Sequence, residues 1–239
     1  MSYKKSSLFF AFQTLKYADS FSTFQQMWRY HSTWKAALMP GRNSVADEQA
    51  WLNFAALDFL RQNLSSGDKV FEYGGGGSTL FFLRRTAFVA TVENDREWFG
   101  ILSAKIKEYE LTHWQGFFIV GAVVSTDNTR RAEEPNHYKS NTSGQENLSY
   151  EEYAKAILQF PEEYFDVVLV DGRARPSCVA ESFSRLKSGG LLIVDNMERP
   201  YYHTAFNERL ADQFETLVQG RFPTPYHPDF TETRIWRKK

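Results

Sequence analysis

The sequence predicts a doubly wound α/β fold, in which helices cover both faces of a mostly parallel sheet. Short apolar runs alternate with helical stretches between residues 70 and 195, the pattern of parallel strands joined by right-handed crossovers. The runs 165–170 and 191–194 are continuously apolar, as in strands that are covered on both sides. A glycine cluster at 74–77 follows the first run and precedes a helical stretch, where such a fold needs a tight turn.

The individual elements follow in order from the pattern. Residues 1–44 are helical and irregular, ending near Pro40–Gly41. A helix is expected from Ser44, because Asp47 three positions later resembles a capping arrangement and the next apolar residues share one face. After residue 67 we expect strands at 70–71, 88–93, 117–120, 165–171, 190–195, 214–218 and 231–236, and helices at 78–86, 96–109, 149–159, 177–187 and 204–213. The last two strands suggest an antiparallel pair at a sheet edge.

Two segments fall outside this alternation. Residues 125–148 form a long polar loop without periodicity, which is either a lid or disordered. Residues 1–44 are rich in aromatic side chains, which either pack a helical segment on the main domain or form an aromatic wall around an organic ligand. We therefore divide the chain into 1–44, an N-terminal helical segment that helps shape an acceptor site, and 45–239, the main domain. The aromatic residues concerned are Phe9, Phe10, Phe12, Phe21, Phe24, Trp28, Tyr30 and Trp34.

Composition excludes several classes of protein. The 239 residues, 42% of them hydrophobic, suffice for one sizeable core. With a net charge of −1 there is no field to hold a polyanion, so no nucleic-acid partner is expected. A single cysteine, Cys178, excludes an intrachain disulfide, and the histidines lack the spacing of a zinc site. No apolar stretch is long enough to span a bilayer, so we expect a cytoplasmic protein without a membrane partner. The oligomeric state stays open, a homo-oligomer included.

The glycine loop, Glu72-Tyr73-Gly-Gly-Gly-Gly-Ser78-Thr79, is the strongest local signal. Its glycines allow a ligand to approach the backbone, and the free N–H groups behind them suit a carboxylate or phosphate. Neither reading frame completes the G-x-G-x-x-G pattern of dinucleotide enzymes, and Glu72 would repel a pyrophosphate. An acid there suits a ligand with an ammonium or sulfonium group. Glu93 closes the next strand about 20 positions later, where an acid reaches ribose hydroxyls.

These residues resemble the acid-x-Gly-x-Gly-x-Gly loop of the class I S-adenosylmethionine-dependent methyltransferases, with Ser78 at the third glycine position. The resemblance covers about residues 45–239 and implies the strand order 3-2-1-4-5-7-6, with a reversed last strand. It also implies S-adenosylmethionine as cofactor, with Glu72 and the glycines on its methionine part and Glu93 on its ribose, while Asp127 or Asn128 faces the adenine. The expected cofactor-binding residues are Glu72, Tyr73, Gly74, Gly75, Gly76, Ser78, Thr79, Glu93, Asp127 and Asp171.

A second group of polar residues follows two neighbouring strands. Asp171 closes one strand and Asp195-Asn196 close the next, so their side chains should converge, because adjacent strands lie about 4.8 Å apart. The set resembles the metal triad of cation-dependent O-methyltransferases, which implies Mg²⁺ and a hydroxyl on a small-molecule acceptor. The alternative is that these acids cap helices. Arg173 and Arg175 are unusual beside a cation, and could bind an anionic acceptor or pair with the acids.

Expected catalytic residues are Asp171, Asp195 and His203, any of which could act as general base, although a histidine at that position is also typical of a solvent-exposed or capping role. Two other functions remain open. One is an NAD(P)-dependent oxidoreductase, disfavoured by the glycine spacing and Glu72. The other is a catalytically silent nucleoside-binding subunit, disfavoured by the intact pair Asp171 and Asp195.

Overall fold

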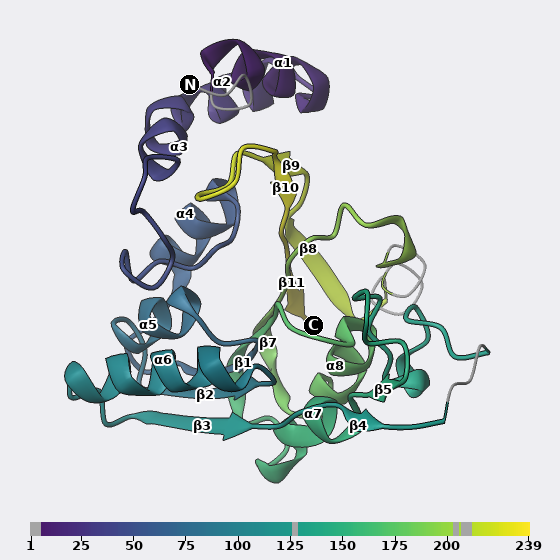
Figure 1. Ribbon diagram of the computed structural model, residues 1–239. Coiled ribbons are helices and arrows are strands. Elements are labelled where there is room, and N and C mark those ends of the chain that lie inside the picture. The colour runs from purple at the N-terminus through teal and green to yellow at the C-terminus, as the bar shows by residue number, and fades with distance from the viewer. Residues whose placement is uncertain (1–5, 126–128, 203–205, 207–211) are drawn as a thin grey trace.

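The computed structural model describes residues 6–125, 129–202, 206 and 212–239, and its centre is a seven-stranded sheet (Figure 1). The sheet strands lie in the order β3-β2-β1-β6-β7-β11-β8, and β11 runs antiparallel to both of its neighbours while the other pairs on the β3 side are parallel. Counted along the chain without the small strands outside this sheet, the order is the expected 3-2-1-4-5-7-6. The sheet strands are β1 (Lys69–Tyr73), β2 (Phe88–Glu93), β3 (Trp114–Phe118), β6 (Phe165–Val170), β7 (Leu186–Val194), β8 (Phe214–Val218) and β11 (Arg234–Lys238).

Helices cover both faces of the sheet, as the doubly wound fold requires (Figure 1). Two short antiparallel ladders, β4–β5 and β9–β10, lie outside it. The helices are α1 (Ser7–Tyr17), α2 (Phe21–Arg29), α3 (His31–Ala37), α4 (Phe54–Asn63), α5 (Gly77–Leu83), α6 (Arg96–Glu108), α7 (Glu151–Lys155) and α8 (Arg175–Ser182), with 3₁₀ turns η2 (Pro135–His137) and η3 (Ala156–Gln159). The ladder strands are β4 (Ala122–Val123), β5 (Leu148–Ser149), β9 (Arg221–Phe222) and β10 (Thr231–Glu232).

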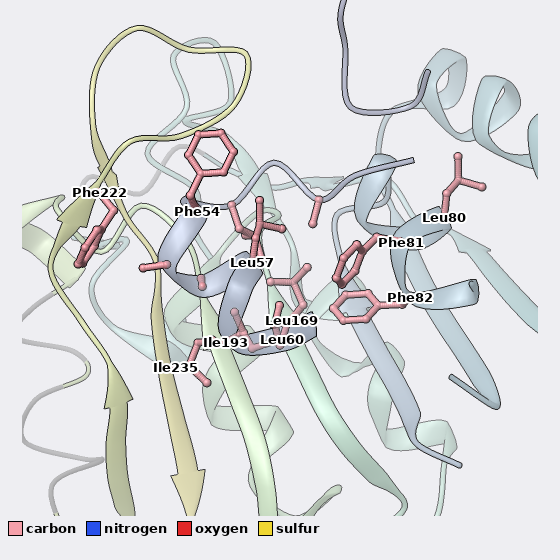
Figure 2. Close-up of a cluster of buried hydrophobic side chains, with 14 of the residues drawn as sticks. Phe54, Leu57, Leu60, Leu80, Phe81, Phe82, Leu169, Ile193, Phe222 and Ile235 are labelled. Carbon is pink, nitrogen blue, oxygen red and sulfur yellow. The ribbon is translucent and has the colours of Figure 1, made fainter. Parts of the chain in front are cut away.

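Alternation along the strands builds two hydrophobic cores. Because successive side chains of a strand point to opposite faces, Leu169 and Ile193 pack under α4 and α5, whereas Val168 and Leu192 pack against α7 and α8. Figure 2 shows the first core, where side chains of α4 and α5 meet those of the central strands. The carboxyl ends of the parallel strands β1, β2 and β6 lie side by side at one end of the sheet. The polar residues singled out in the sequence lie at this end.

The helix expected from Ser44 is α4, whose N-cap lies nine residues later, at Asn53. Asn53, not Ser44, caps it: the Asn53 side chain accepts a hydrogen bond from the Ala56 N–H at 2.9 Å, and its own amide donates to the Thr231 carbonyl at 3.2 Å. Residues 44–52 instead form turns, in which the Ser44 carbonyl accepts from the Gln49 N–H. The local capping signal was misread because the partner that fixes Asn53 lies far away in the sequence.

The N-terminal helices pack at one end of the molecule beside the β9–β10 ladder (Figure 1). Phe10 is fully buried there between Trp28, Trp34 and Phe230, with ring centroids 5.0–5.8 Å apart. For these aromatic residues the packing interpretation is confirmed. Phe21, in contrast, is 75% exposed.

Three remaining expectations concern loops and boundaries. The described part of the polar loop is packed against α8, since Ser177 donates a hydrogen bond to the Pro135 carbonyl and Tyr138 donates one to Glu181 at 2.7 Å. Strand β7 begins at Leu186, four residues before the expected start. The expected helix 204–213 lies almost entirely outside the described residues. No helix in the described ranges combines the length and apolarity that crossing a bilayer requires.

Candidate functional site

A cavity of about 860 Å³ opens at the carboxyl ends of the central strands, and its size lies in the upper part of the range of ligand pockets. The loop after β1 forms one wall, the start of α6 a second, and the segments after β6 and β7 a third. Its lining includes six of the residues expected from the sequence: Gly74, Gly75, Gly76, Ser78, Glu93 and Asp171.

Two positions of the glycine loop require glycine, because a Cβ at either would come too close to backbone atoms of another segment. Gly74 adopts a φ of +89°, and a Cβ there would lie 2.9 Å from the carbonyl oxygen of Asp171. A Cβ on Gly77 would overlap the backbone of Ser44, which folds over the start of α5. The loop is thus held between the end of β6 and the N-terminal turns, and this contact places Ser44 in the cavity wall.

Glu72 supports the loop from below and is absent from the cavity lining. Its side chain is fully buried, and one carboxyl oxygen accepts hydrogen bonds from Thr79 at 2.5 Å and Thr91 at 3.1 Å. Thr79 in turn accepts from the Gly76 N–H at 3.0 Å, so Glu72 fixes the loop through Thr79. Burial raises the pKa of Glu72 to about 8. Tyr73 lies on the opposite face, where its hydroxyl donates to the Ala154 carbonyl at 2.7 Å.

Glu93 points toward the glycine loop. Its carboxylate accepts from the Gly75 N–H at 2.9 Å and from the N–H groups of Asn94 and Asp95 at 2.6 and 2.8 Å. A carboxylate has about four acceptor positions, so one remains for a ligand. Glu93 is 6% exposed, and burial raises its pKa.

Trp98 is a cavity residue that the sequence analysis did not single out. Its indole N–H donates to the Gly75 carbonyl at 2.6 Å, and its ring lies beside Gly76, where a Cβ would contact it at 3.5 Å. Together with Ile101 on the same helix, it supplies apolar surface to the cavity. Asp95 could have indicated the position of Trp98 from the sequence. Asp95 lies two residues after the acid that closes β2 and caps α6 by accepting a hydrogen bond from the Trp98 N–H.

Arg175 joins the two strand-end acids. Its guanidinium is 2.8 Å from the Asp171 carboxylate and also donates to the backbone carbonyls of Asp195 and Gly172. Only 6% of Arg175 is exposed. Asp171 and Asp195 converge as expected, since both line one small cavity, and Arg175 binds the Asp171 carboxylate and the backbone carbonyl of Asp195. Burial raises the pKa of Asp195 to about 8, and raises that of Asp171 against the opposing effect of Arg175.

The oxygens of the expected triad, Asp171, Asp195 and Asn196, are already engaged within the protein, and a metal role for them stays a prediction. The Asp195 carboxylate accepts from Thr233 at 2.6 Å and from the Asn196 amide at 2.9 Å, and the Asn196 oxygen accepts from Arg199 at 2.9 Å. Since protein donors already bind these oxygens, and Arg175 pairs with the Asp171 carboxylate, a cation would have to compete with both. Among the described residues no group of three or more His, Cys, Asp or Glu side chains could hold a metal ion.

Three expected site residues cannot be placed. Asp127, Asn128 and His203 lie outside the described residues. The cavity lining also contains Arg173, Arg199 and Tyr201, which lie in the segments that follow β6 and β7.

The fold is shared with known methyltransferases. A Streptococcus mutans protein described as a methyltransferase and crystallised in complex with SAH is 12% identical, with a TM-score of 0.53 over 77% of this chain and 96% of its own. A Clostridium thermocellum protein described as an rRNA methylase is 11% identical, with a TM-score of 0.53 over 84% of this chain and 98% of its own. The chain has the class I methyltransferase fold. At these identities the likeness concerns the fold alone. No family model matches the chain, and neither does any curated protein.

Proposed function

We propose that the chain is an S-adenosylmethionine-dependent methyltransferase that acts on a hydroxyl group of a small molecule. The observation that carries the proposal is the hydrogen bond between Glu93 and the Gly75 N–H, which joins the glycine loop and the second acid at one end of a large cavity. Asp171 lies in the wall of the same cavity. A methyltransferase fold with this loop and acid supports a nucleoside cofactor at that end and an acceptor near Asp171.

The residues divide into groups that would bind the cofactor and groups that position them. Gly74, Gly75, Gly76 and Ser78 line the cavity and would contact the methionine part, while Glu93 would accept a ribose hydroxyl at its remaining acceptor position. Glu72 is a positioning residue in this scheme, because it is buried and acts on the loop through hydrogen bonds. Thr79 transmits that effect and Tyr73 anchors the other face of β1. The adenine contact expected of Asp127 stays a prediction.

S-adenosylmethionine, when bound, supplies the methyl group and a neutral thioether as leaving group. The protein aligns the acceptor hydroxyl with the methyl carbon and excludes water. Asp171 is the best-placed group to take up the hydroxyl proton, because it lines the cavity and burial raises its pKa. Asp195 borders an adjoining cavity of about 380 Å³ with its carboxylate oxygens already bonded, so we assign it to holding this region in place. The role of His203 stays a prediction.

Trp51 and Ser44 extend the wall from the N-terminal side. Ser44 lines the large cavity, and Trp51, 46% exposed, lines both cavities. We propose that residues 1–44 shape the acceptor site through this connection: the N-terminal helices fix the turns that carry Ser44 and Trp51.

Calorimetric titration with S-adenosylhomocysteine, with NAD as the competing ligand, tests the cofactor. We expect S-adenosylhomocysteine to bind and NAD to fail, and Glu93→Ala to weaken binding by about tenfold through loss of a charge-assisted hydrogen bond. Glu108→Ala, which removes an exposed acid at the end of α6, is the control, and thermal melting without ligand confirms that both variants fold. Binding of NAD with no response to S-adenosylhomocysteine would establish the oxidoreductase alternative.

A methyl-transfer assay tests the acceptor class, with hydroxylated small molecules and total RNA as separate substrates. The net charge of −1 gives no general attraction for RNA, so we expect transfer to small molecules alone. Transfer to RNA would contradict this part of the proposal. Binding of S-adenosylhomocysteine without transfer to any acceptor would indicate the silent nucleoside-binding subunit.

A further inference from the structure

The charged side chains that line the large cavity separate by sign. The carboxylates cluster beside the glycine loop and the start of α6, and the guanidinium groups follow β6 and β7. The first group is Glu93, Asp95 and Glu97, and the second is Arg173, Arg175 and Arg199. Asp171 also lines the cavity beside the arginines, where its charge is paired with Arg175. A cofactor on the glycine loop occupies the acidic end, so the acceptor meets the basic end.

The three arginines are not equivalent. The charge of Arg175 is balanced by Asp171 at 2.8 Å. Arg173 donates to the Thr142 hydroxyl at 2.8 Å, and Arg199 to the Asn196 amide oxygen at 2.9 Å, which are both neutral acceptors. Neither forms an ion pair with a carboxylate anywhere in the described ranges. A guanidinium has five donors, so both keep N–H groups free for a ligand.

Backbone conformation directs these side chains. Ala174 is buried and has a φ of +44°, and Asn196 has a φ of +54°, conformations that cost about 1–3 kcal/mol each outside glycine. The turn at Ala174 sends Arg175 inward to the acids, while Arg173 reaches Thr142 on the polar loop. Strained backbone of this kind concentrates at ligand sites, where the surrounding structure maintains it.

We propose that the methyl acceptor carries a carboxylate or phosphate group and that Arg173 and Arg199 bind it. The inference rests on the proposed function, and adds the chemical class of the acceptor. Ser140 and Asn141 line the cavity next to Thr142 and supply further neutral donors. Arg173 and Arg199 both lower the pKa of Asp171, so the anion would lie close to the group that takes up the proton. The negative charge of Asp171 does not repel the anion strongly, because Arg175 balances it.

Titration of the S-adenosylhomocysteine-loaded protein with inorganic phosphate and, separately, with benzoate tests the anion site. We expect at least one of them to bind at millimolar concentration, and Arg173→Gln and Arg199→Gln each to weaken it about tenfold. The matched control is Arg237→Gln, on the exposed part of β11 next to Glu215, with binding unchanged. Affinity for S-adenosylhomocysteine should stay the same in all three variants. The relative affinity for the two anions shows which group the acceptor carries.

Two results overturn the inference while leaving the proposed function intact. One is S-adenosylhomocysteine binding without binding of either anion, and the other is anion binding that the two cavity variants leave unchanged. A protein that fails to bind S-adenosylhomocysteine refutes the proposed function instead. Turnover gives an independent comparison: hydroxybenzoate should be methylated faster than phenol, or a sugar phosphate faster than the sugar, and the preference should disappear in Arg173→Gln. A preference for the uncharged partner in both pairs also overturns the inference.

Discussion

Replacing Arg175 by methionine removes the positive charge that pairs with Asp171, the acid at the end of β6. The side chain makes four contacts: with the Asp171 carboxylate, and with the backbone carbonyls of Asp171, Gly172 and Asp195. Methionine fills much of the same volume, so the change in stability reports the lost charge and hydrogen bonds more than a cavity. Asp171 would then lose its ion pair, and Asp195 would keep only its hydrogen bonds from Thr233 and Asn196.

The expected loss of stability is large. Breaking a buried ion pair by removing one partner costs about 3–5 kcal/mol. For a chain of this length, 1 kcal/mol corresponds to about 2–4 °C in Tm, which predicts a decrease of about 6–20 °C. Since typical domains are stable by about 5–15 kcal/mol, the variant should still fold at low temperature. Arg175→Lys keeps the charge but not the fork of donors, so its loss should be smaller.

The loss should also depend on pH. A carboxyl group whose folded pKa lies above its unfolded value stabilises the fold at low pH, and this stabilisation disappears as the pH rises through the folded pKa. Burial already raises the pKa of Asp171 and Asp195, and removal of Arg175 raises both further. The variant should therefore lose more stability relative to the wild type at pH 8 than at pH 5.5.

Urea denaturation at the two pH values measures this difference, with Arg237→Met as a matched exposed control that should change stability by less than about 0.5 kcal/mol. A loss under about 1 kcal/mol, or a loss equal at both pH values, would show that Arg175 is not the compensating charge.

Three further predictions concern the loop and the ion. Glu72→Gln should melt increasingly above the wild type as the pH rises from about 4 to about 8, because the unfolded carboxyl releases its proton near its usual pKa of 4.5 whereas burial keeps the folded pKa at about 8; a lower Tm at pH 8 would show that the fold needs the carboxylate. Gly77→Ala should cost more than about 3 kcal/mol, because its Cβ overlaps the backbone of Ser44, whereas Gly76→Ala should cost less than about 1 kcal/mol, and the reverse order in urea denaturation contradicts the loop geometry. EDTA should leave turnover unchanged, since protein donors already bind the oxygens that would hold a cation; a loss that Mg²⁺ restores would contradict this.

The topology could be read from the sequence because it depends on short-range periodicity. Continuously apolar strands and the turn between β1 and α5 are encoded within a few residues, and they suffice for strand order and for the edge that carries the cavity. Helix boundaries were less accessible. The capping of α4 at Asn53 depends on Thr231, almost 180 positions away, and no local pattern contains that information.

The alternation of residues along β1 contains the information that places the Glu72 side chain inside the protein. Phe71 and Tyr73 face α7 and α8, so alternation places Glu72 under α5 instead, next to Thr91, its register partner on β2. An acid in that position binds hydroxyls of its own fold before it can bind a ligand. The expectation that it contacts the cofactor came from the motif, which does not record the face of the strand.

The two arginines after Asp171 show what sequence alone could not decide. Binding an anionic acceptor and pairing with the acids were alternatives for both. In the structure Arg175 is paired with Asp171, whereas Arg173 donates to Thr142. The different directions of the two arginine side chains depend on the left-handed conformation of Ala174 between them. An alanine in the sequence does not predict that conformation. Arg175, the first residue of α8, pairs with the Asp171 carboxylate, so a positive charge already lies beside one of the acids that the sequence predicts at a cation site. In the proposed reaction the acceptor hydroxyl loses its proton to the Asp171 carboxylate, and the anionic group of the acceptor, bound by Arg173 and Arg199, orients that hydroxyl.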